Sequence, residues 1–111
     1  MDIYYKSSRM QKLFGSAKEM EKVWGKPHAK KIQQRLTELE AADSLSDISH
    51  LPPLRLHQLT QNRKGEFAID TVNRFRLIFI PYHDPLPLKE DGGIDQTRVT
   101  KIQIIEVQDY H

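Results

Sequence analysis

The chain has 111 residues, of which 29% are charged and none is cysteine, and its formal net charge at pH 7 is +2. This length fits one domain with a modest core, and the absence of cysteine excludes disulfides and thiolate metal sites. No apolar run reaches membrane length, and Asp2, Lys6 and Arg9 interrupt any N-terminal signal peptide. We therefore predict a single cytoplasmic domain over residues 1–111, with no membrane segment.

The charges are distributed unevenly along the chain. Residues 1–35 hold nine Lys or Arg and three acids, residues 36–54 hold acids only, and residues 55–76 hold five Lys or Arg and two acids. Such segregation is typical of a surface that meets a polyanion on one side. Solvated helix faces produce the same pattern, so both interpretations stay open for the N-terminal part.

The N-terminal part of the chain predicts a strand followed by two helices. Residues 1–5 favour a short strand, and apolar residues then recur at a helical period from about residue 8 to Val23. Gly25 predicts the end of this helix, and Pro27 suits the first turn of the next. The second helix is apolar on one face and carries lysines, glutamines and Arg35 on the other. These patterns predict a helical hairpin.

The rest of the chain predicts a run of strands. An acidic connection over 43–53 contains two prolines, which exclude a helix there. Turn signals at Gly65 and Asn73, with strand-like patterns around them, predict strands over about 54–60, 66–72, 74–81 and 98–108. Residues 82–97, which are rich in proline, glycine and charge, predict an exposed, mobile loop.

The alternation within the third of these strands predicts two different faces. Phe75, Leu77 and Phe79 alternate with Arg74 and Arg76, so one face is apolar and the other begins with arginines. Helices that are segregated from a run of strands predict an α+β fold. We expect the N-terminal strand and helical hairpin to pack on one face of a small, mainly antiparallel, twisted sheet, which leaves the other face for a ligand.

Five residues on or just after the predicted strands point to chemistry on RNA: His57, Arg76, Asp109, Tyr110 and His111. Metal-free RNA cleavage needs a group that takes the proton of the 2′-hydroxyl, a cation that holds the phosphate and a group that protonates the leaving oxygen. Imidazole exchanges protons near neutral pH, and the planar guanidinium fork suits phosphate. The ordinary alternatives are a surface histidine, a solvated or ion-paired arginine and a frayed tail.

Further cations and an aromatic residue have weaker signals. Arg63 and Lys64 in the first turn, and Arg74 beside Arg76, are predicted to contact nucleic acid, although turn cations are often only solvated. Trp24 is predicted to pack in the core rather than to stack on a base. Acids and histidines lack the spacing of helical metal ligands, and no Gly-rich phosphate loop is present, so we predict neither metal nor cofactor.

Several short motifs together match a known family. They resemble the RelE/ParE toxin superfamily and, within it, the HigB-like killer proteins of plasmid maintenance systems, over most of the chain. The resemblance is weakest in the loop at 82–97. The matching motifs are Leu56-His57-x-Leu59, Arg63-x-Gly65, Phe67-x-Ile69, Asn73-x-Phe75-Arg76 and Asp109-Tyr110-His111.

This resemblance implies a fold, an activity and partners. It implies a RelE-like toxin of a type II toxin-antitoxin system, acting as a ribosome-dependent mRNA endoribonuclease (mRNA interferase) that inhibits translation. The catalytic residues of the family fall on His57, Arg76, Asp109, Tyr110 and His111, without an assignment of acid and base. The implied partners are the ribosome, mRNA and a cognate antitoxin, usually a helix-turn-helix protein that alone contacts operator DNA.

The chain departs from the family pattern at two places, and other functions stay open. Thr60 stands where related toxins often have a lysine, and the loop at 82–97 is longer than a tight hairpin. One alternative is a ParE-like toxin that binds DNA gyrase without nuclease chemistry. The other is a catalytically decayed module that only binds an antitoxin. His57, Tyr110 and His111 favour the nuclease, because a gyrase binder needs none of them.

Overall fold

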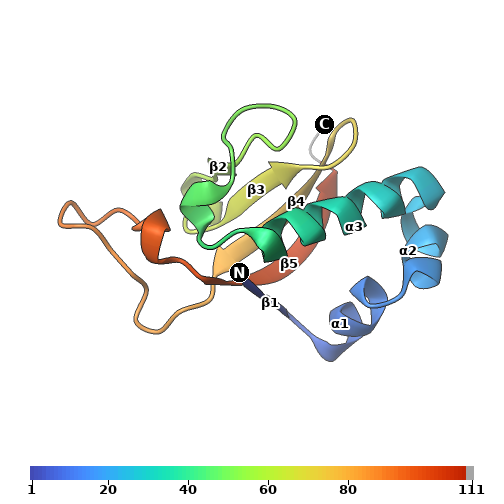
Figure 1. The fold of residues 1–111 in the computed structure, drawn as a ribbon, viewed down its shortest axis with the longest axis horizontal. Helices are drawn as coiled ribbons and strands as arrows, with labels where there is room; N and C mark the ends of the chain where they lie inside the picture. Colours follow the sequence, from blue (N-terminus) through green and yellow to red (C-terminus); the bar gives the residue numbers. More distant parts are fainter. Residues whose placement is uncertain (110–111) are drawn as a thin grey trace.

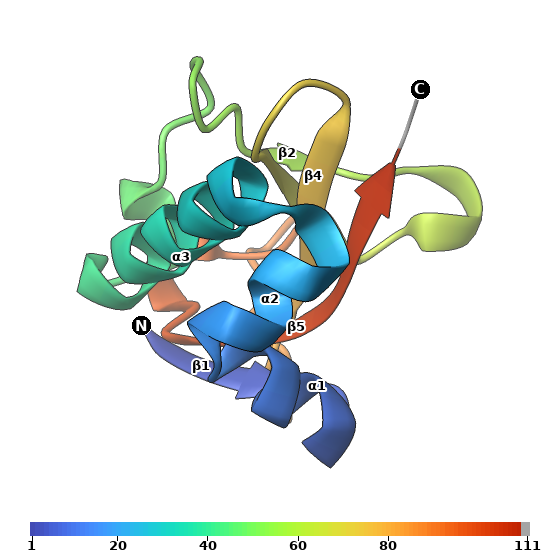
Figure 2. The same ribbon diagram turned by 90° about the vertical axis from the view of Figure 1, so that its right-hand side faces the viewer.

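The structure is a computed structural model that describes residues 1–109, so the predicted site residues Tyr110 and His111 lie outside the described residues. Within that range, three helices pack against one face of a five-stranded sheet (Figures 1 and 2). The strand order is β1-β5-β4-β3-β2, with β1 parallel to β5 and the other pairs antiparallel. The strands are β1 (Asp2–Tyr5), β2 (His57–Gln58), β3 (Phe67–Asp70), β4 (Phe75–Pro81) and β5 (Lys101–Asp109). The predicted α+β architecture is confirmed.

The helical part differs from the predicted hairpin because the first helix is broken. The helices are α1 (Ser8–Phe14), α2 (Ala17–Trp24) and α3 (Lys26–Ala41). The predicted single helix from about residue 8 to Val23 is wrong: Gly15 caps the end of α1, and the side chain of Ser16 accepts a hydrogen bond from the Glu19 amide to start α2. The predicted stop at Gly25 is confirmed, since its φ of 82° ends α2 and precedes α3.

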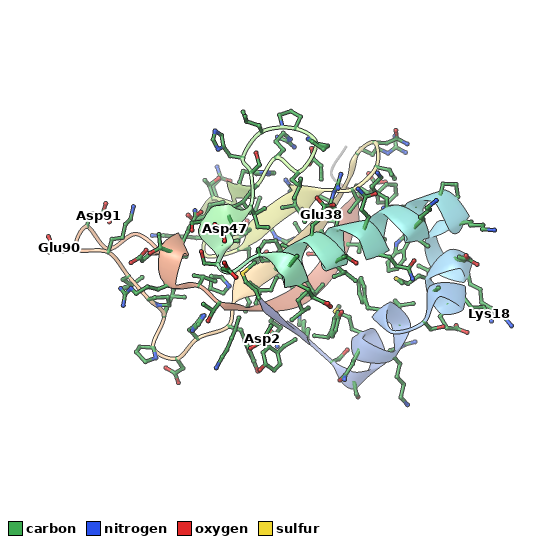
Figure 3. The ribbon with its side chains drawn as sticks, in the orientation of Figure 1. Asp2, Lys18, Glu38, Asp47, Glu90 and Asp91 are labelled. Atoms are coloured by element: carbon green, nitrogen blue, oxygen red, sulfur yellow. The ribbon has the colours of Figure 1, made fainter. Side chains whose placement is uncertain are left out.

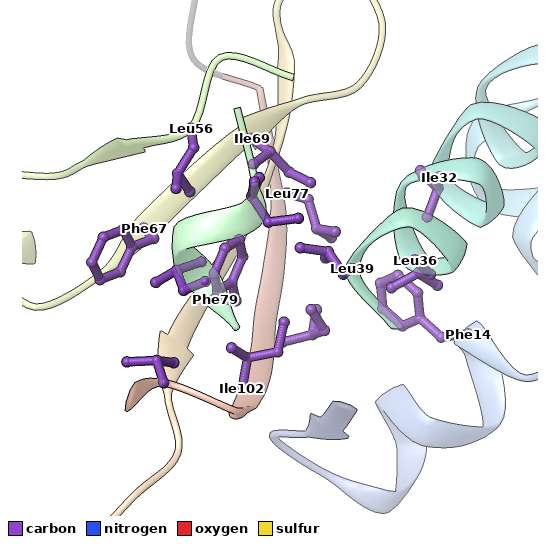
Figure 4. Packing of buried hydrophobic residues seen from close by; sticks show 14 of the residues in the cluster. Phe14, Ile32, Leu36, Leu39, Leu56, Phe67, Ile69, Leu77, Phe79 and Ile102 are labelled. Atoms are coloured by element: carbon purple, nitrogen blue, oxygen red, sulfur yellow. The ribbon is translucent and has the colours of Figure 1, made fainter. Parts of the chain in front are cut away.

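The main core lies between the helices and the sheet. Leu and Ile side chains on α3 face apolar side chains of the central strands (Figure 4). Burial of each such side chain contributes about 1.5–3 kcal/mol, so this layer fixes the helices on the sheet. The fully buried members include Met20, Ile32, Leu39, Phe67, Ile69, Leu77, Phe79, Ile102 and Ile104. Trp24 packs beside this cluster, with its ring centroid 5.7 Å from that of Phe14, in agreement with the predicted packing role.

The helix α3 also buries a cation. Arg35, which we predicted on the polar face of this helix, is only 2% exposed. Its Nε donates to the backbone oxygen of Asp70 at 2.7 Å, and its Nη1 lies 2.7 Å from Oε1 of Glu38. Matched hydrogen bonds and charge make the burial of a guanidinium tolerable. Arg35 therefore ties α3 to the end of β3.

The sequence predicted β4 well and β2 poorly. The expected strand over 54–60 shrinks to the two residues of β2, because Arg55 and Gln61 have φ values of 52° and 57°, which interrupt an extended backbone on both sides. The predicted left-handed turn residue Asn73 is confirmed, with a φ of 50°. The strand β4 covers nearly the predicted range.

The predicted loop over 82–97 has internal structure. His83 Nε2 accepts hydrogen bonds from the amides of Thr100 and Lys101 at 3.0 and 3.2 Å, which hold the start of the loop against the start of β5. Farther along, Leu88 forms a β-bridge with Ile94, and a short 3-10 helix, η3 (Gln96–Arg98), follows. The segment is an exposed loop, as predicted, but one with its own hydrogen bonds.

A buried histidine links α3 to the β3–β4 turn. His28 is 6% exposed, and its Nε2 lies 2.9 Å from Oγ1 of Thr71, which donates to the backbone oxygen of Phe75. The hydroxyl proton of Thr71 is thus engaged, so the imidazole donates to this hydroxyl. Burial lowers the pKa of His28 below the 6.5 of an exposed imidazole.

We predict that the free energy of unfolding falls as the pH is lowered through the 6.5 of an exposed imidazole, because the unfolded chain then binds a proton that folded His28 binds less readily. The variant His28→Gln should have a flatter profile in urea unfolding at a series of pH values. His50→Gln, at an exposed position, is the matched control and should keep the wild-type slope. Equal slopes for the two variants would contradict this role of His28.

Candidate active site

The candidate site lies on the sheet face opposite the helices. His57 on β2 pairs with Ala68 on β3, and Ala68 pairs with Ile78 on β4. Ala68 and Ile78 belong to a small apolar cluster separate from the main core, which also contains Leu59. Directly paired residues share a face, so His57 lies on this second face.

Two of the predicted catalytic residues meet on this face. Nη1 of Arg76 lies 3.4 Å from Nε2 of His57, although the two residues are on non-adjacent strands. Nε of Arg76 donates to Oε1 of Gln108 at 2.8 Å, from the strand on its other side. On the opposite side of the imidazole, Nδ1 lies 2.9 Å from the backbone oxygen of Arg55. His57 and Arg76, which are both half-buried, are therefore held in place by Arg55 and Gln108.

The last residues of β5 lie beside Arg76 on β4. Gln108 pairs with Arg76, and Asp109 pairs with Phe75. Because successive residues of a strand alternate, the side chains of Gln108 and Asp109 belong to opposite faces. The carboxylate of Asp109 forms an ion pair of 3.2 Å with Nε of Arg74, which lies in the turn just before β4. The predicted residues Tyr110 and His111 follow Asp109 outside the described residues.

The two predicted turn cations have different environments. Nε of Arg63 donates to Oε1 of Glu66 at 2.7 Å, and its Nη2 bonds the carboxylate of Glu106 on β5. These hydrogen bonds raise the pKa of Arg63 above its ordinary value. Arg63 therefore joins the β2–β3 connection to β5, and its charge is matched by carboxylates. Lys64, the next residue, is exposed on the same connection.

Three residues around the pair were not predicted from the sequence. Asp70 binds the guanidinium of Arg55 through both carboxylate oxygens, with distances of 2.8 Å to Nε and 3.1 Å to Nη2. Gln108 orients Arg76 from β5. Strand alternation would have identified Gln108 once the register with β4 was known. Local sequence carries no signal for the left-handed backbone of Arg55, because arginine has no preference for that conformation.

Charged side chains also differ between the two ends of the molecule. Lys18 lies on α2 at one end, and Glu90 and Asp91 lie at the tip of the 82–97 loop at the other (Figure 3).

Among residues 1–109, no group of three or more His, Asp or Glu side chains is placed to hold a metal ion. In the same range, no helix combines the length and apolar character required to cross a membrane.

Comparison with known proteins identifies the fold. No protein-family model and no curated protein sequence matches the chain. Among solved structures, a YoeB/ParE toxin from Agrobacterium tumefaciens aligns over 100% of both chains with a TM-score of 0.56 and 8% identity. The chain shares its fold with YoeB/ParE toxins.

Two further structures, both from Staphylococcus aureus, show the same likeness. A YoeB-YefM complex has a TM-score of 0.54 at 14% identity, and a YoeB dimer has a TM-score of 0.53 at 15% identity. Each alignment covers 100% of this chain and 97% of the other. The RelE-like fold implied by the sequence motifs is thus confirmed, and identities this low show the fold alone.

Proposed function

We propose that the chain is the toxin of a type II toxin-antitoxin system, of the HigB-like kind, and that it cleaves translated mRNA on the ribosome without a metal ion. The observation that carries the proposal is the contact of 3.4 Å between His57 and Arg76 on the sheet face opposite the helices. An imidazole can exchange protons near neutral pH and a guanidinium can bind phosphate, and the two stand together on a fold shared with YoeB/ParE toxins.

The chemistry available to this pair is transesterification of RNA. The 2′-oxygen attacks the adjacent phosphorus as its proton passes to a general base, and the bond to the 5′-oxygen breaks as an acid supplies a proton to it. The products are a 2′,3′-cyclic phosphate and a 5′-hydroxyl. Arg76 would stabilise the charge that develops on the phosphate oxygens. Tyr110 and His111 are proposed to complete the site, as the motif resemblance implies.

Two further cations, Lys64 and Arg74, are proposed to bind the RNA backbone. Lys64 is exposed, and the side chain of Arg74 is 53% exposed despite its ion pair with Asp109. Cations that bind phosphates other than the reacting one position a nucleic acid without reading its sequence. We assign Arg63 a smaller direct role than the sequence motif implies, because Glu66 and Glu106 already bind its guanidinium.

The proposed antitoxin would bind at a groove between α1 and α2. A hollow of about 590 Å³ there is lined by Arg9, Lys12, Leu13, Glu19 and Val23. Leu13 and Val23 supply apolar surface, and Arg9 and Lys12 outnumber the one acid, Glu19. This lining fits an amphipathic partner segment that carries acidic residues. Val23 is 56% exposed and adds apolar surface to this groove.

We predict that Val23→Asp weakens capture of the antitoxin encoded beside this gene, because a carboxylate would replace apolar surface in the groove proposed to receive an acidic segment. A cost of about 2 kcal/mol corresponds to roughly a thirtyfold higher Kd. The matched control is Leu88→Asp, which adds the same charge at a side chain 46% exposed in the distant loop. Co-purification and calorimetry measure both. Unchanged affinity for Val23→Asp would place the antitoxin elsewhere.

We predict that Arg76→Ala abolishes growth arrest without unfolding the chain. Loss of a cation that stabilises the transition state typically costs a hundred- to thousandfold in rate, or about 2.7–4 kcal/mol. The control Lys101→Ala removes an exposed cation of the same sheet and should stay toxic. The measurement follows translation, mRNA cleavage and plasmid supercoiling after induction.

The order of events after induction separates the candidate functions. Wild-type chain should lower translation and cut mRNA before DNA topology changes. Early loss of supercoiling with intact mRNA would favour a gyrase-binding toxin instead. A chain that arrests nothing in the absence of antitoxin would favour a decayed binding module.

A further inference from the structure

We propose that Arg55 is a positioning residue whose backbone oxygen fixes the tautomer of His57, so that Nε2 is the proton acceptor and His57 is the general base. The inference deepens the proposed function and rests on it for the catalytic role. The positioning itself is a property of the folded chain and can be tested without any activity.

The tautomer follows from the two neighbours of the imidazole. A backbone oxygen only accepts hydrogen bonds, so its contact of 2.9 Å with Nδ1 requires the proton on Nδ1. A guanidinium only donates, so its contact of 3.4 Å from Nη1 of Arg76 requires a lone pair on Nε2. Both contacts specify the same form of His57. That form presents a lone pair beside the cation that would hold the phosphate.

The position of the accepting oxygen depends on an uncommon backbone conformation. Arg55 has a φ of 52°, in the left-handed region that residues other than glycine seldom adopt. Its amide donates to the backbone oxygen of Leu51 at 2.9 Å, and its guanidinium binds both carboxylate oxygens of Asp70. The ion pair therefore stabilises a strained residue beside the proposed site, where such strain is often functional.

Asp70 is itself held by contacts with residues outside the sheet. Its amide donates to the backbone oxygen of Leu54 at 2.8 Å, and its backbone oxygen accepts from Nε of buried Arg35 at 2.7 Å. Arg35 is bound by Glu38 on the same helix. The orientation of His57 is thus connected through Arg55 and Asp70 to α3.

The test compares two variants that lose the same side chain contacts. Arg55→Ala removes the guanidinium and disfavours a positive φ, whereas Arg55→Gly removes the guanidinium and favours it. The full-length chain is made by cell-free synthesis with ¹⁵N-labelled histidine. Nitrogen NMR above neutral pH then reports which ring nitrogen of His57 carries the proton. We expect Nδ1–H in wild type and in Arg55→Gly, and a mixture of tautomers in Arg55→Ala.

The same variants are assayed for mRNA cleavage on ribosomes. Partners that orient metal-bound imidazoles are typically worth about ten- to a hundredfold in activity, and by analogy Arg55→Ala should lose that much, mainly in kcat. Arg55→Gly should stay much closer to wild type. Equal losses in both variants with an unchanged tautomer would overturn the proposal and make Arg55 a direct RNA contact.

A third variant and a fold control complete the test. Asp70→Asn keeps the backbone oxygen that binds Arg35 but removes the charge that binds Arg55, and it should shift the tautomer in the same direction as Arg55→Ala. Thermal unfolding shows that each variant is folded. If wild type cuts no RNA, the proposed function fails, while the NMR result still decides the positioning of His57. An Nε2–H tautomer in wild type would overturn the proposal outright.

Discussion

The register of β4 between β3 and β5 is the constraint on which the rest of the structure depends. Leu77 and Phe79 are fully buried against the helical layer. A slip of one residue would turn every side chain of β4 to the other face and expose this core, so the register is strongly specified. The same register sets Arg76 beside Gln108 on one side and near His57 on the other. Packing on one face therefore determines how the candidate site residues are placed on the opposite face.

Three arginines of the chain have a structural role that depends on contact with a carboxylate. Arg35, Arg55 and Arg63 each bind a carboxylate, and each connects two parts of the fold that are distant in sequence. The pairs of Arg55 and Arg63 are partly exposed, and pairs of this kind add little stability by themselves, but they define geometry. Their shared effect is to hold the connections around β2 in place. An irregular segment with only two strand residues can thereby present His57 in a defined orientation.

Patterns within short stretches of sequence predicted the parts of the fold that depend on neighbouring residues. Period-two alternation identified β4 and its two faces, and the conformational freedom of Gly25 and Asn73 identified a helix stop and a turn. The break between α1 and α2 was missed because apolar residues continue at a helical period across Gly15. Propensity alone does not show where tertiary packing will interrupt such a pattern.

Features that depend on contacts between residues far apart along the chain could not be predicted from the sequence. Arg35 was predicted on a polar helix face, since its acceptor on Asp70 lies 35 residues away along the chain. Among the candidate site residues, His57 and Arg76 were named from their residue types and motif, and the structure brings them together. Arg55 was missed because its role depends on its backbone oxygen, which every residue has. Asp109 was named, and its ion pair with Arg74 depends on a strand pairing not visible in the sequence.

We propose that this face of the sheet cleaves RNA by using the 2′-hydroxyl of the substrate. The most direct measurement uses purified ribosomes with two messages that are identical except for a single 2′-deoxy nucleotide at the cleaved position. Primer extension and analysis of the ends follow the reaction. We expect the ordinary message to be cut, leaving a 2′,3′-cyclic phosphate and a 5′-hydroxyl, and the deoxy message to stay intact. Equal cleavage of both messages would contradict the account, because the attacking oxygen would then come from elsewhere.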